Sequence, residues 1–371
     1  MKKLKLLLFL TLLSLVSQVV RAGDLTTVPT PNVGKGANNL LGVAAAGDND
    51  VWAVGDSFNQ QASVYRTLIE HWDGARWSVV RSPNSTTSWN FLSGIAVNSA
   101  SDIWSVGQAL TGNIYGTLIE RWDGQRWQVI PSPSVAGVSN FLLGVSVIST
   151  NDIWAVGYTQ TASVFHPLSL HWDGASWTIV ATPGQARLNS VDGVASNDVW
   201  AVGITEPGEK TLTMHWNGSV WSVVASPNDG AEDNILWAVN AISSNDVWSV
   251  GDAGTGNAIA LHWNGTQWNL VPLPIVSNDA TNAVLVGLAV RSSADIWATG
   301  QYIVPLLGSA EQTLVEHWDG ASWSIVTSPN AKNSNNRLDG ATLTPNGTLW
   351  TVGTVGPFGK AERTLSLAKT P

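Results

Sequence analysis

A Trp-centred string that recurs seven times constrains the fold of this chain more than any other feature. The string reads Asp-(Val/Ile)-Trp-(Ala/Ser)-(Val/Thr)-Gly, and its last copy is the variant Thr348-Leu349-Trp350. Successive copies lie 46 to 53 residues apart. A period of this length is typical of an array in which each unit buries its apolar face against the next unit. The seven Trp residues are Trp52, Trp104, Trp154, Trp200, Trp248, Trp297 and Trp350.

A second string, (His/Arg)-Trp-(Asp/Asn)-Gly-x-x-Trp, follows the first in six of the seven repeats. Together the two strings contain 19 of the 21 Trp residues. We interpret these residues as the core of each unit and the packing between units, because a large flat ring buries much area at low rotamer entropy. Sugar-stacking platforms are the alternative interpretation. The pairs are Trp72/Trp77, Trp122/Trp127, Trp172/Trp177, Trp216/Trp221, Trp263/Trp268 and Trp318/Trp323.

Each repeat reads as four short strands, and the second repeat illustrates the pattern. Phe91–Val97 alternates apolar residues, and Asp102–Gly107 is rich in β-branched and aromatic residues. Thr117–Trp122 and Trp127–Ile130 are the third and fourth strands, joined through Asp123-Gly124, a pair that suits a tight type I′ hairpin. Beyond residue 22 no stretch has a sustained 3.6-residue period, so we expect no helix there.

The two ends of the chain complement each other. The seventh repeat stops after its third strand, at Thr364–Leu367. Leu25–Asn32 matches the fourth-strand segment Trp77–Asn84, so the first strand can complete the last unit. We therefore predict an all-β fold, a seven-bladed β-propeller of four-stranded blades whose ring is closed by the N-terminal strand.

The first 22 residues are typical of a signal peptide. Met1–Lys5 is basic, Leu6–Val20 is mostly apolar, and Val20-Arg21-Ala22 suits a signal peptidase. We expect cleavage near Ala22 and a secreted, periplasmic or extracellular protein with no further membrane span; an uncleaved anchor is the alternative. The propeller then occupies 23–371, with blades at about 39–83, 91–133, 141–183, 188–227, 235–274, 284–329 and 337–371 plus 25–32.

Composition excludes several classes of protein. With 44% hydrophobic residues the chain can bury a large core, which excludes intrinsic disorder. The absence of Cys excludes disulfide scaffolds, thiolate metal sites and Cys nucleophiles. The net charge of -9, about -13 without the four cationic residues of the leader, argues against a nucleic-acid partner. We expect no cofactor.

The repeat resembles a kelch-type propeller blade. Val51–Gly55, Trp72 and Trp77 stand in the kelch order, an apolar strand ending in Gly followed by aromatic residues in the third and fourth strands. The same cadence resembles tectonin-type repeats, which occur in propeller lectins. Either resemblance implies the fold rather than a function, because propellers host many activities. The copper radical oxidases of the kelch kind need a Tyr–Cys crosslink, which a chain without Cys cannot form.

Histidine and aspartate recur at one position per repeat, so we expect them to be spread around the ring as structural residues. No catalytic or metal-binding residue is assigned to them. The Asp residues follow Ser/Asn-rich turns, which predicts that they accept hydrogen bonds from nearby backbone N–H groups. The His residues are His71, His171, His215, His262 and His317, with Arg121 in the same position of the second repeat. The Asp residues are Asp50, Asp102, Asp152, Asp198, Asp246 and Asp295.

The links between strands differ in length, and this asymmetry carries most of the functional information. Links one-to-two and three-to-four are short, whereas links two-to-three and four-to-one are longer and variable. The two long classes emerge on one face of a propeller, where function concentrates. All four Tyr are expected in two-to-three loops and Trp89 in a four-to-one link, and we predict that they bind a ligand. The Tyr residues are Tyr65, Tyr115, Tyr158 and Tyr302.

A recurring Asn precedes the small residue of the first strand and forms a near-complete ring of candidate ligand-binding residues. Such a ring can hydrogen-bond a ligand at the channel mouth, or it can cap the turn into the strand. Amide and aromatic groups suit neutral polyhydroxylated ligands, and suit a protein partner nearly as well. The residues are Asn39, Asn90, Asn140, Asn189, Asn234 and Asn336.

Three functional hypotheses follow. The leading one is a secreted, monomeric, non-enzymatic binding module that uses the long-loop face, with carbohydrate or a protein as its ligand. The rival is an extracellular polysaccharide hydrolase or lyase with carboxylates at the channel mouth, drawn from non-repeated acids such as Asp192 and Asp339. The third is a structural protein of an envelope or matrix.

Overall fold

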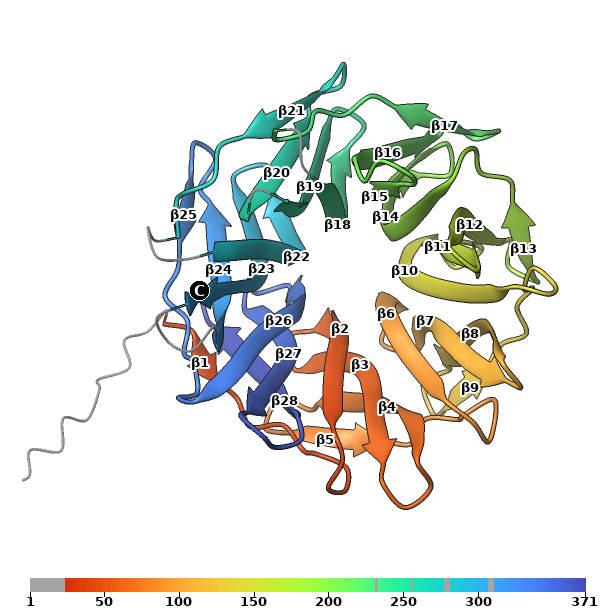
Figure 1. Cartoon of the computed structure of the whole chain (residues 1–371), viewed down its shortest axis with the longest axis vertical. Helices are drawn as coiled ribbons and strands as arrows, with labels where there is room; N and C mark the ends of the chain where they lie inside the picture. The colour runs from red at the N-terminus through yellow and green to blue at the C-terminus, as the bar shows by residue number, and fades with distance from the viewer. Residues whose placement is uncertain (1–23, 231–232, 255, 277–280, 306–309) are drawn as a thin grey trace, which may run out of the picture.

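The computed structural model describes residues 24–371 except 231–232, 255, 277–280 and 306–309. These residues form seven four-stranded sheets arranged radially around a central channel (Figure 1). They contain no α-helix, and hence no helix that is long and apolar enough to cross a membrane. The prediction of a seven-bladed β-propeller is confirmed. The predicted signal peptide, 1–22, lies outside the described residues.

In six blades the strands are paired antiparallel in chain order, from the channel outward. The first blade contains β2 (Asn38–Gly47), β3 (Asp50–Asn59), β4 (Val64–Trp72) and β5 (Trp77–Val80). The other five are β6 (Asn90–Ser99), β7 (Asp102–Thr111), β8 (Ile114–Trp122), β9 (Trp127–Val129); β10 (Ser139–Ser149), β11 (Asp152–Thr161), β12 (Val164–Trp172), β13 (Trp177–Val180); β14 (Ala186–Ala195), β15 (Asp198–Thr205), β16 (Thr211–Trp216), β17 (Trp221–Val224); β18 (Asn234–Ser243), β19 (Asp246–Ala253), β20 (Asn257–Trp263), β21 (Trp268–Val271); and β22 (Thr281–Ser292), β23 (Asp295–Val304), β24 (Ala310–Trp318), β25 (Trp323–Ile325).

The seventh blade joins both ends of the chain. It contains β26 (Ser334–Leu343), β27 (Leu349–Pro357), β28 (Arg363–Lys369) and, outermost, β1 (Thr26–Thr27). Thr26 pairs with Ala368, and the neighbouring Leu25 is buried in the same apolar cluster as Leu338 and Leu367. The predicted closure by the N-terminal strand is confirmed.

The repeated Trp residues pack within and between blades. The ring of Trp52 on β3 lies 4.9 Å from that of Trp122 and 5.7 Å from that of Trp127, both in the next blade. Trp104 makes the same contacts with Trp172 and Trp177 at 5.1 and 5.6 Å. The Trp residues of the first string therefore pack at the interfaces between neighbouring blades, as the core interpretation expects.

The glycine that ends the first string has a steric role. On β7 a Cβ at Gly107 would collide with the carbonyl oxygen of Phe91 on the paired strand β6. The two strands come this close where their register shifts, between Leu92 and Gly94. A side chain at this position would therefore force the innermost strands apart.

The second and third strands extend further than the sequence predicted. β7 continues to Thr111 and β8 begins at Ile114, so most of the expected two-to-three loop is an extended hairpin. The prediction that the four Tyr lie in loops is wrong, since Tyr65 is in β4, Tyr115 in β8, Tyr158 in β11 and Tyr302 in β23. Aromatic and β-branched residues favour the continued ladder.

Candidate functional site

The two faces of the ring differ as the link lengths predicted. The short-turn face carries the one-to-two turns and the Asp/Asn-Gly hairpins, because Gly47 pairs with Asp50 and Trp72 with Trp77 at the same end of the blade. The long-loop face carries the four-to-one links and the tips of the long hairpins.

The repeated Asp and His residues pair with each other within their blades near the short-turn face. In the first blade Oδ1 of Asp50 lies 2.8 Å from Nε2 of His71 and accepts a hydrogen bond of 2.7 Å from Nε1 of Trp52. His71 also stacks on Trp52 at 4.2 Å. The prediction that Asp50 accepts hydrogen bonds from backbone N–H groups is wrong, because its partners are the side chains of Trp52 and His71. The His–Asp contact recurs for His171, His215, His262 and His317.

Backbone capping is instead performed by the Asp or Asn of the hairpin turn. Oδ1 of Asp73 accepts hydrogen bonds from the backbone N–H groups of Ala75 and Arg76, both at 2.9 Å. These bonds to the ionised carboxylate lower the pKa of Asp73. Among the described residues, no three His, Asp or Glu side chains gather as a metal site requires.

Four of the six candidate Asn residues cap the turn into the first strand. The buried Asn90 accepts a hydrogen bond from the N–H of Thr86 at 3.3 Å and donates to the carbonyl oxygens of Thr86 and Ser88 at 3.1 and 2.8 Å. Asn140 and Asn336 make the same bonds, and Asn234 accepts the corresponding bond from the N–H of Asp229. The turn-capping alternative therefore describes these four amides.

Asn39 and Asn189 stand elsewhere in the repeat. In the first blade the capping residue is Asn38, and Asn39 donates to Oδ2 of Asp56 at 3.1 Å. Asn189 lies three residues after the capping position, lines the channel, and donates to the carbonyl oxygen of Leu236 at 2.9 Å. The small residue of β14 that follows the register shift is Ser190, as Gly94 is in β6, so Asn189 lies directly before that residue and not four residues before it.

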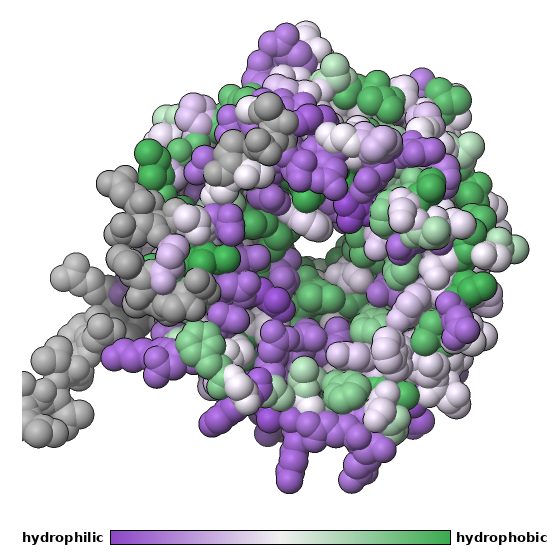
Figure 2. Space-filling view, viewed as in Figure 1, coloured by the Kyte–Doolittle hydropathy of each residue, from purple (hydrophilic) through white to green (hydrophobic). Residues whose placement is uncertain are grey.

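The channel mouth at the long-loop face is a cavity of about 640 Å³ lined by the inner strands of all seven blades. The channel opens at the centre of the ring in Figure 2. Aliphatic and small side chains make up most of its wall. The exceptions are one indole and four polar side chains, which we call the mouth cluster. Its members are Asn189, Trp237, Asp252, Gln301 and Asp339.

Two members of the mouth cluster bond to each other, and two others have an acceptor oxygen that is free to bind a ligand. Nε1 of Trp237 donates to Oδ1 of Asp252 at 2.6 Å, which orients the indole. Oδ2 of Asp339 and Oε1 of Gln301 are buried and have no hydrogen-bond partner among the described residues. A buried polar atom of this kind gains free energy from a ligand that supplies a donor.

Burial raises the pKa of the two mouth carboxyls. The pKa of Asp339 rises to about 6, an effect that Arg337 opposes and Glu311 and Glu362 reinforce. Burial also raises the pKa of Asp252, while its hydrogen bond from Trp237 lowers it. The mouth therefore holds one carboxyl that exchanges its proton close to neutral pH.

Asp192 lies deeper in the channel, toward the short-turn face, and connects three blades. It accepts hydrogen bonds from Oγ of Ser146 at 2.8 Å, Nδ2 of Asn240 at 3.2 Å and the N–H of Ala241 at 2.9 Å. Both oxygens of this carboxyl group accept hydrogen bonds from neighbouring blades, so Asp192 links three blades and is not available to a ligand.

Aromatic side chains, half-buried except for the exposed Trp89, form a continuous arc over the first three blades, beside the channel mouth. Tyr65 contacts Phe91 at 5.0 Å, Tyr115 contacts Phe141 at 5.3 Å, and Phe141 stacks on Tyr158 at 4.8 Å. Phe91 and Phe141 lie two residues before the mouth-lining Ser93 and Leu143. We call this set the aromatic arc, comprising Phe58, Tyr65, Trp89, Phe91, Tyr115, Phe141, Tyr158 and Phe165.

The structure thus brings together some of the candidate residues and separates others. Tyr65, Tyr115, Tyr158 and Trp89 belong to the arc, and Trp89 is the exposed member. Tyr302 packs against the apolar cluster between the fifth and sixth blades. Trp237, Asp252 and Gln301 were missed, although Trp237 is one of only two Trp residues outside the repeated strings.

Comparison with known proteins shows the fold. No protein-family model and no curated protein matches the chain. It is similar to the structure of YCF48 bound to D1 peptide, with 13% identity over 95% of this chain and 96% of that one and a TM-score of 0.57. An ulvan lyase of polysaccharide lyase family PL25 gives 11% identity, 91% and 95% coverage and a TM-score of 0.54. A six-bladed fucose-recognising lectin from Aleuria aurantia is 14% identical over 80% of this chain and 98% of that one, with a TM-score of 0.53.

Proposed function

We propose that this protein is a secreted binding module that takes a carbohydrate ligand at the channel mouth. The observation that carries the proposal is the mouth cluster, in which an indole held by Asp252 stands with Asn189, Gln301 and Asp339 in one cavity. An aromatic face stacks on the apolar face of a sugar ring, while amides and carboxyls pair with its hydroxyl groups.

Size and surroundings support the same ligand class. A cavity of about 640 Å³ is within the range of small-molecule sites, and the aromatic arc extends the surface along one side. A lectin and a polysaccharide lyase among the structural neighbours are named for sugar ligands. Cleavage near Ala22 would bring the protein to extracellular glycans. The kinship with kelch or tectonin repeats stays a prediction.

The test is a glycan array probed with the purified protein, reading bound and released sugar together. We expect binding without release, weakened at least tenfold by Trp237→Ala or Asn189→Ala. Gln125→Ala, in an exposed hairpin turn on the short-turn face, is the control and should leave binding unchanged. Binding that survives both mouth substitutions but is lost in Trp89→Ala would move the site to the aromatic arc. Silence of the array would favour a protein partner or a structural role.

A polysaccharide hydrolase or lyase is the second candidate, and one observation favours it. Asp252 and Asp339 come from different blades, line the same cavity, and both have a raised pKa. Glycoside cleavage commonly uses two carboxyls, one of them protonated. Under this hypothesis sugar is released on the array, and Asp339→Asn abolishes release while binding persists.

A further inference from the structure

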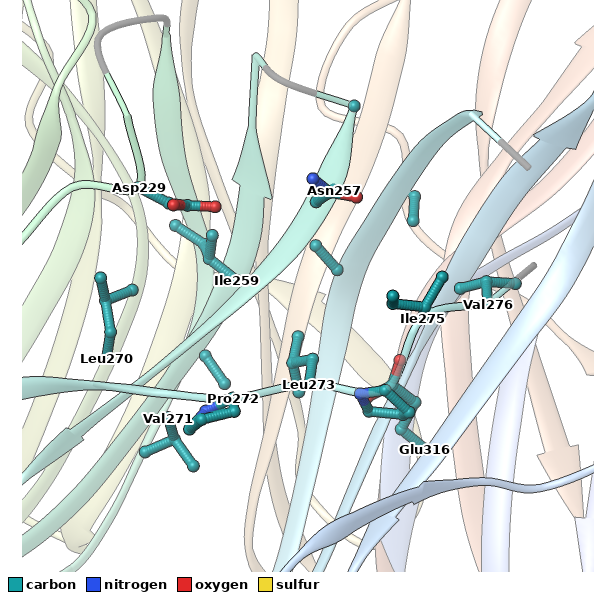
Figure 3. Close-up of a pocket in the computed structure, with 15 residues that line it drawn as sticks. Asp229, Asn257, Ile259, Leu270, Val271, Pro272, Leu273, Ile275, Val276 and Glu316 are labelled. Carbon is teal, nitrogen blue, oxygen red and sulfur yellow. The ribbon is translucent and has the colours of Figure 1, made fainter. Parts of the chain in front are cut away.

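A second cavity, of about 420 Å³, lies between the fifth and sixth blades, outside the channel. Figure 3 shows Asp229 and Asn257 at one end of it and Glu316 at the other, with apolar side chains between them. The apolar wall includes Ile259 of β20 and Leu273 in the segment after β21. The channel-mouth proposal uses none of these residues.

Glu316 is the unusual group in this cavity. The side chain is 1% exposed, and its Oε2 has no hydrogen-bond partner among the described residues. Burial raises the pKa of Glu316 to about 8. A buried carboxyl without a partner is costly unless a donor or a cation reaches it.

The second blade shows how the same position is satisfied internally. Glu120 occupies the position of Glu316 in the repeat, and Oγ of Ser82, from the preceding blade, donates to it at 2.8 Å. Ser82 stands five residues after Trp77, and Leu273 stands five residues after Trp268. At the seam between the fifth and sixth blades an isobutyl group therefore replaces the hydroxyl donor, and the carboxyl faces a cavity.

We propose that this cavity binds a small primary ammonium compound with an apolar body, its ammonium paired with Glu316. The apolar wall accepts the hydrocarbon part, and no aromatic residue or amide from the channel mouth takes part. Asp229 at the far end adds negative charge, and the net charge of -9 attracts cations in general. The proposal is independent of carbohydrate binding.

Proton balance gives the site a recognisable signature. With a pKa of about 8 the free carboxyl is almost fully protonated at pH 6, and pairing with an ammonium ion requires the carboxylate. Binding at pH 6 therefore releases close to one proton from Glu316 to solvent, and the ligand keeps its three N–H bonds. Affinity should rise with pH up to about 8, because alkylamines, like the Lys side chain with its pKa of about 10.4, stay charged there.

Isothermal titration calorimetry with n-hexylammonium and with 1-hexanol tests the proposal on the intact protein. We expect hexylammonium to bind at least tenfold more tightly than hexanol, and more tightly at pH 8 than at pH 6. At pH 6, buffers of different ionisation enthalpy should reveal release of close to one proton. Equal affinities, no binding at millimolar concentration, or no proton release would each overturn the proposal.

Three variants locate the site. Glu316→Gln should remove the preference for the ammonium, and Leu273→Ser, which restores the hydroxyl of the second blade, should weaken hexylammonium several-fold. Glu120→Gln is the matched control, because it changes the same repeat position at a seam where Ser82 already serves the carboxyl, and it should leave binding unchanged. Loss of hexylammonium binding in Glu120→Gln, or an unchanged preference for the ammonium in Glu316→Gln, would overturn the assignment. Melting curves confirm that each variant is folded. If Glu316→Gln does not fold, Leu273→Ser provides the second test.

Discussion

Oγ of Ser82 donates a hydrogen bond to Oε2 of Glu120 across the seam between the first two blades, at 2.8 Å. Glu70 and Glu316 occupy the same repeat position, each with a buried oxygen that has no partner among the described residues. The other four blades place an apolar residue there, namely Leu170, Met214, Leu261 and Leu367. The seam therefore accepts an apolar side chain, and each Glu is a deviation that costs stability.

Stability should fall as pH rises from about 5 to 8. Burial raises the pKa of Glu70, Glu120 and Glu316 from an ordinary value of 4.5 to about 8. Between these values the folded state holds more protons than the unfolded state, so the free energy of unfolding decreases with pH and levels off above 8. At about 1.4 kcal/mol per pKa unit, the loss is at most about 5 kcal/mol per carboxyl. Urea unfolding at pH 5, 7 and 9 measures it.

A triple Glu→Gln variant at these positions supplies the decisive comparison. Its unfolding midpoint should change much less across the same pH range, because the amides do not titrate and only smaller contributions remain, from carboxyls such as Asp56 and Asp339 with a pKa of about 6. Gln125→Glu, which adds an exposed carboxyl, is the control and should keep the slope of the unmodified protein. A triple variant with an unchanged slope would show that other groups cause the pH dependence.

Arg121 should be replaceable by His but not by Ala. Its Nε lies 2.6 Å from Oδ1 of Asp102, and its guanidinium covers Trp104 at 4.9 Å, where other blades place His. Arg121→Ala leaves Asp102 without its cation and should cost about 1–3 kcal/mol, whereas Arg121→His should stay within about 1 kcal/mol. Thermal unfolding of both variants checks this, and equal losses would contradict the interchangeability of Arg and His.

Asn90 and Asn189 should separate stability from binding. Asn90→Ala removes a buried amide that makes hydrogen bonds within its turn, and should cost about 2 kcal/mol while glycan affinity of the folded protein is unchanged. Asn189→Ala should lower glycan affinity and leave the melting temperature nearly unchanged, because this amide lines the channel mouth. Paired melting curves and binding isotherms measure both. An affinity loss in Asn90→Ala would revive the ligand-binding hypothesis for the Asn ring.

The blade count and ring closure were predictable because Trp spacing and the incomplete last repeat report them directly. The channel mouth was not. Which residue of an inner strand faces the channel depends on a register shift, such as that between Leu188 and Ser190, which residue spacing does not show. Trp237 has no Trp counterpart in the other blades, and Gln301 recurs only as Gln108 of the second blade, so no repeat pattern singles them out. The length of the hairpin between the second and third strands was also not predictable, because the turn at Gly112, with its φ of 62°, does not determine how far the ladder extends on either side.

The closing strand should control the stability of the whole ring. Leu25 is 6% exposed and packs in the seventh blade with Leu349 and Leu365, so one short strand joins the two ends of the chain. Leu25→Ala should cost about 2–5 kcal/mol, the range for large-to-small substitutions in a core. Val33→Ala, at a residue 42% exposed, is the control and should cost less than about 0.5 kcal/mol. The two unfolding midpoints provide the measurement. If they are equal, the ring does not depend on its N-terminal strand; if Leu25→Ala alone lowers the midpoint in a single cooperative transition, closure of the seventh blade stabilises all seven together.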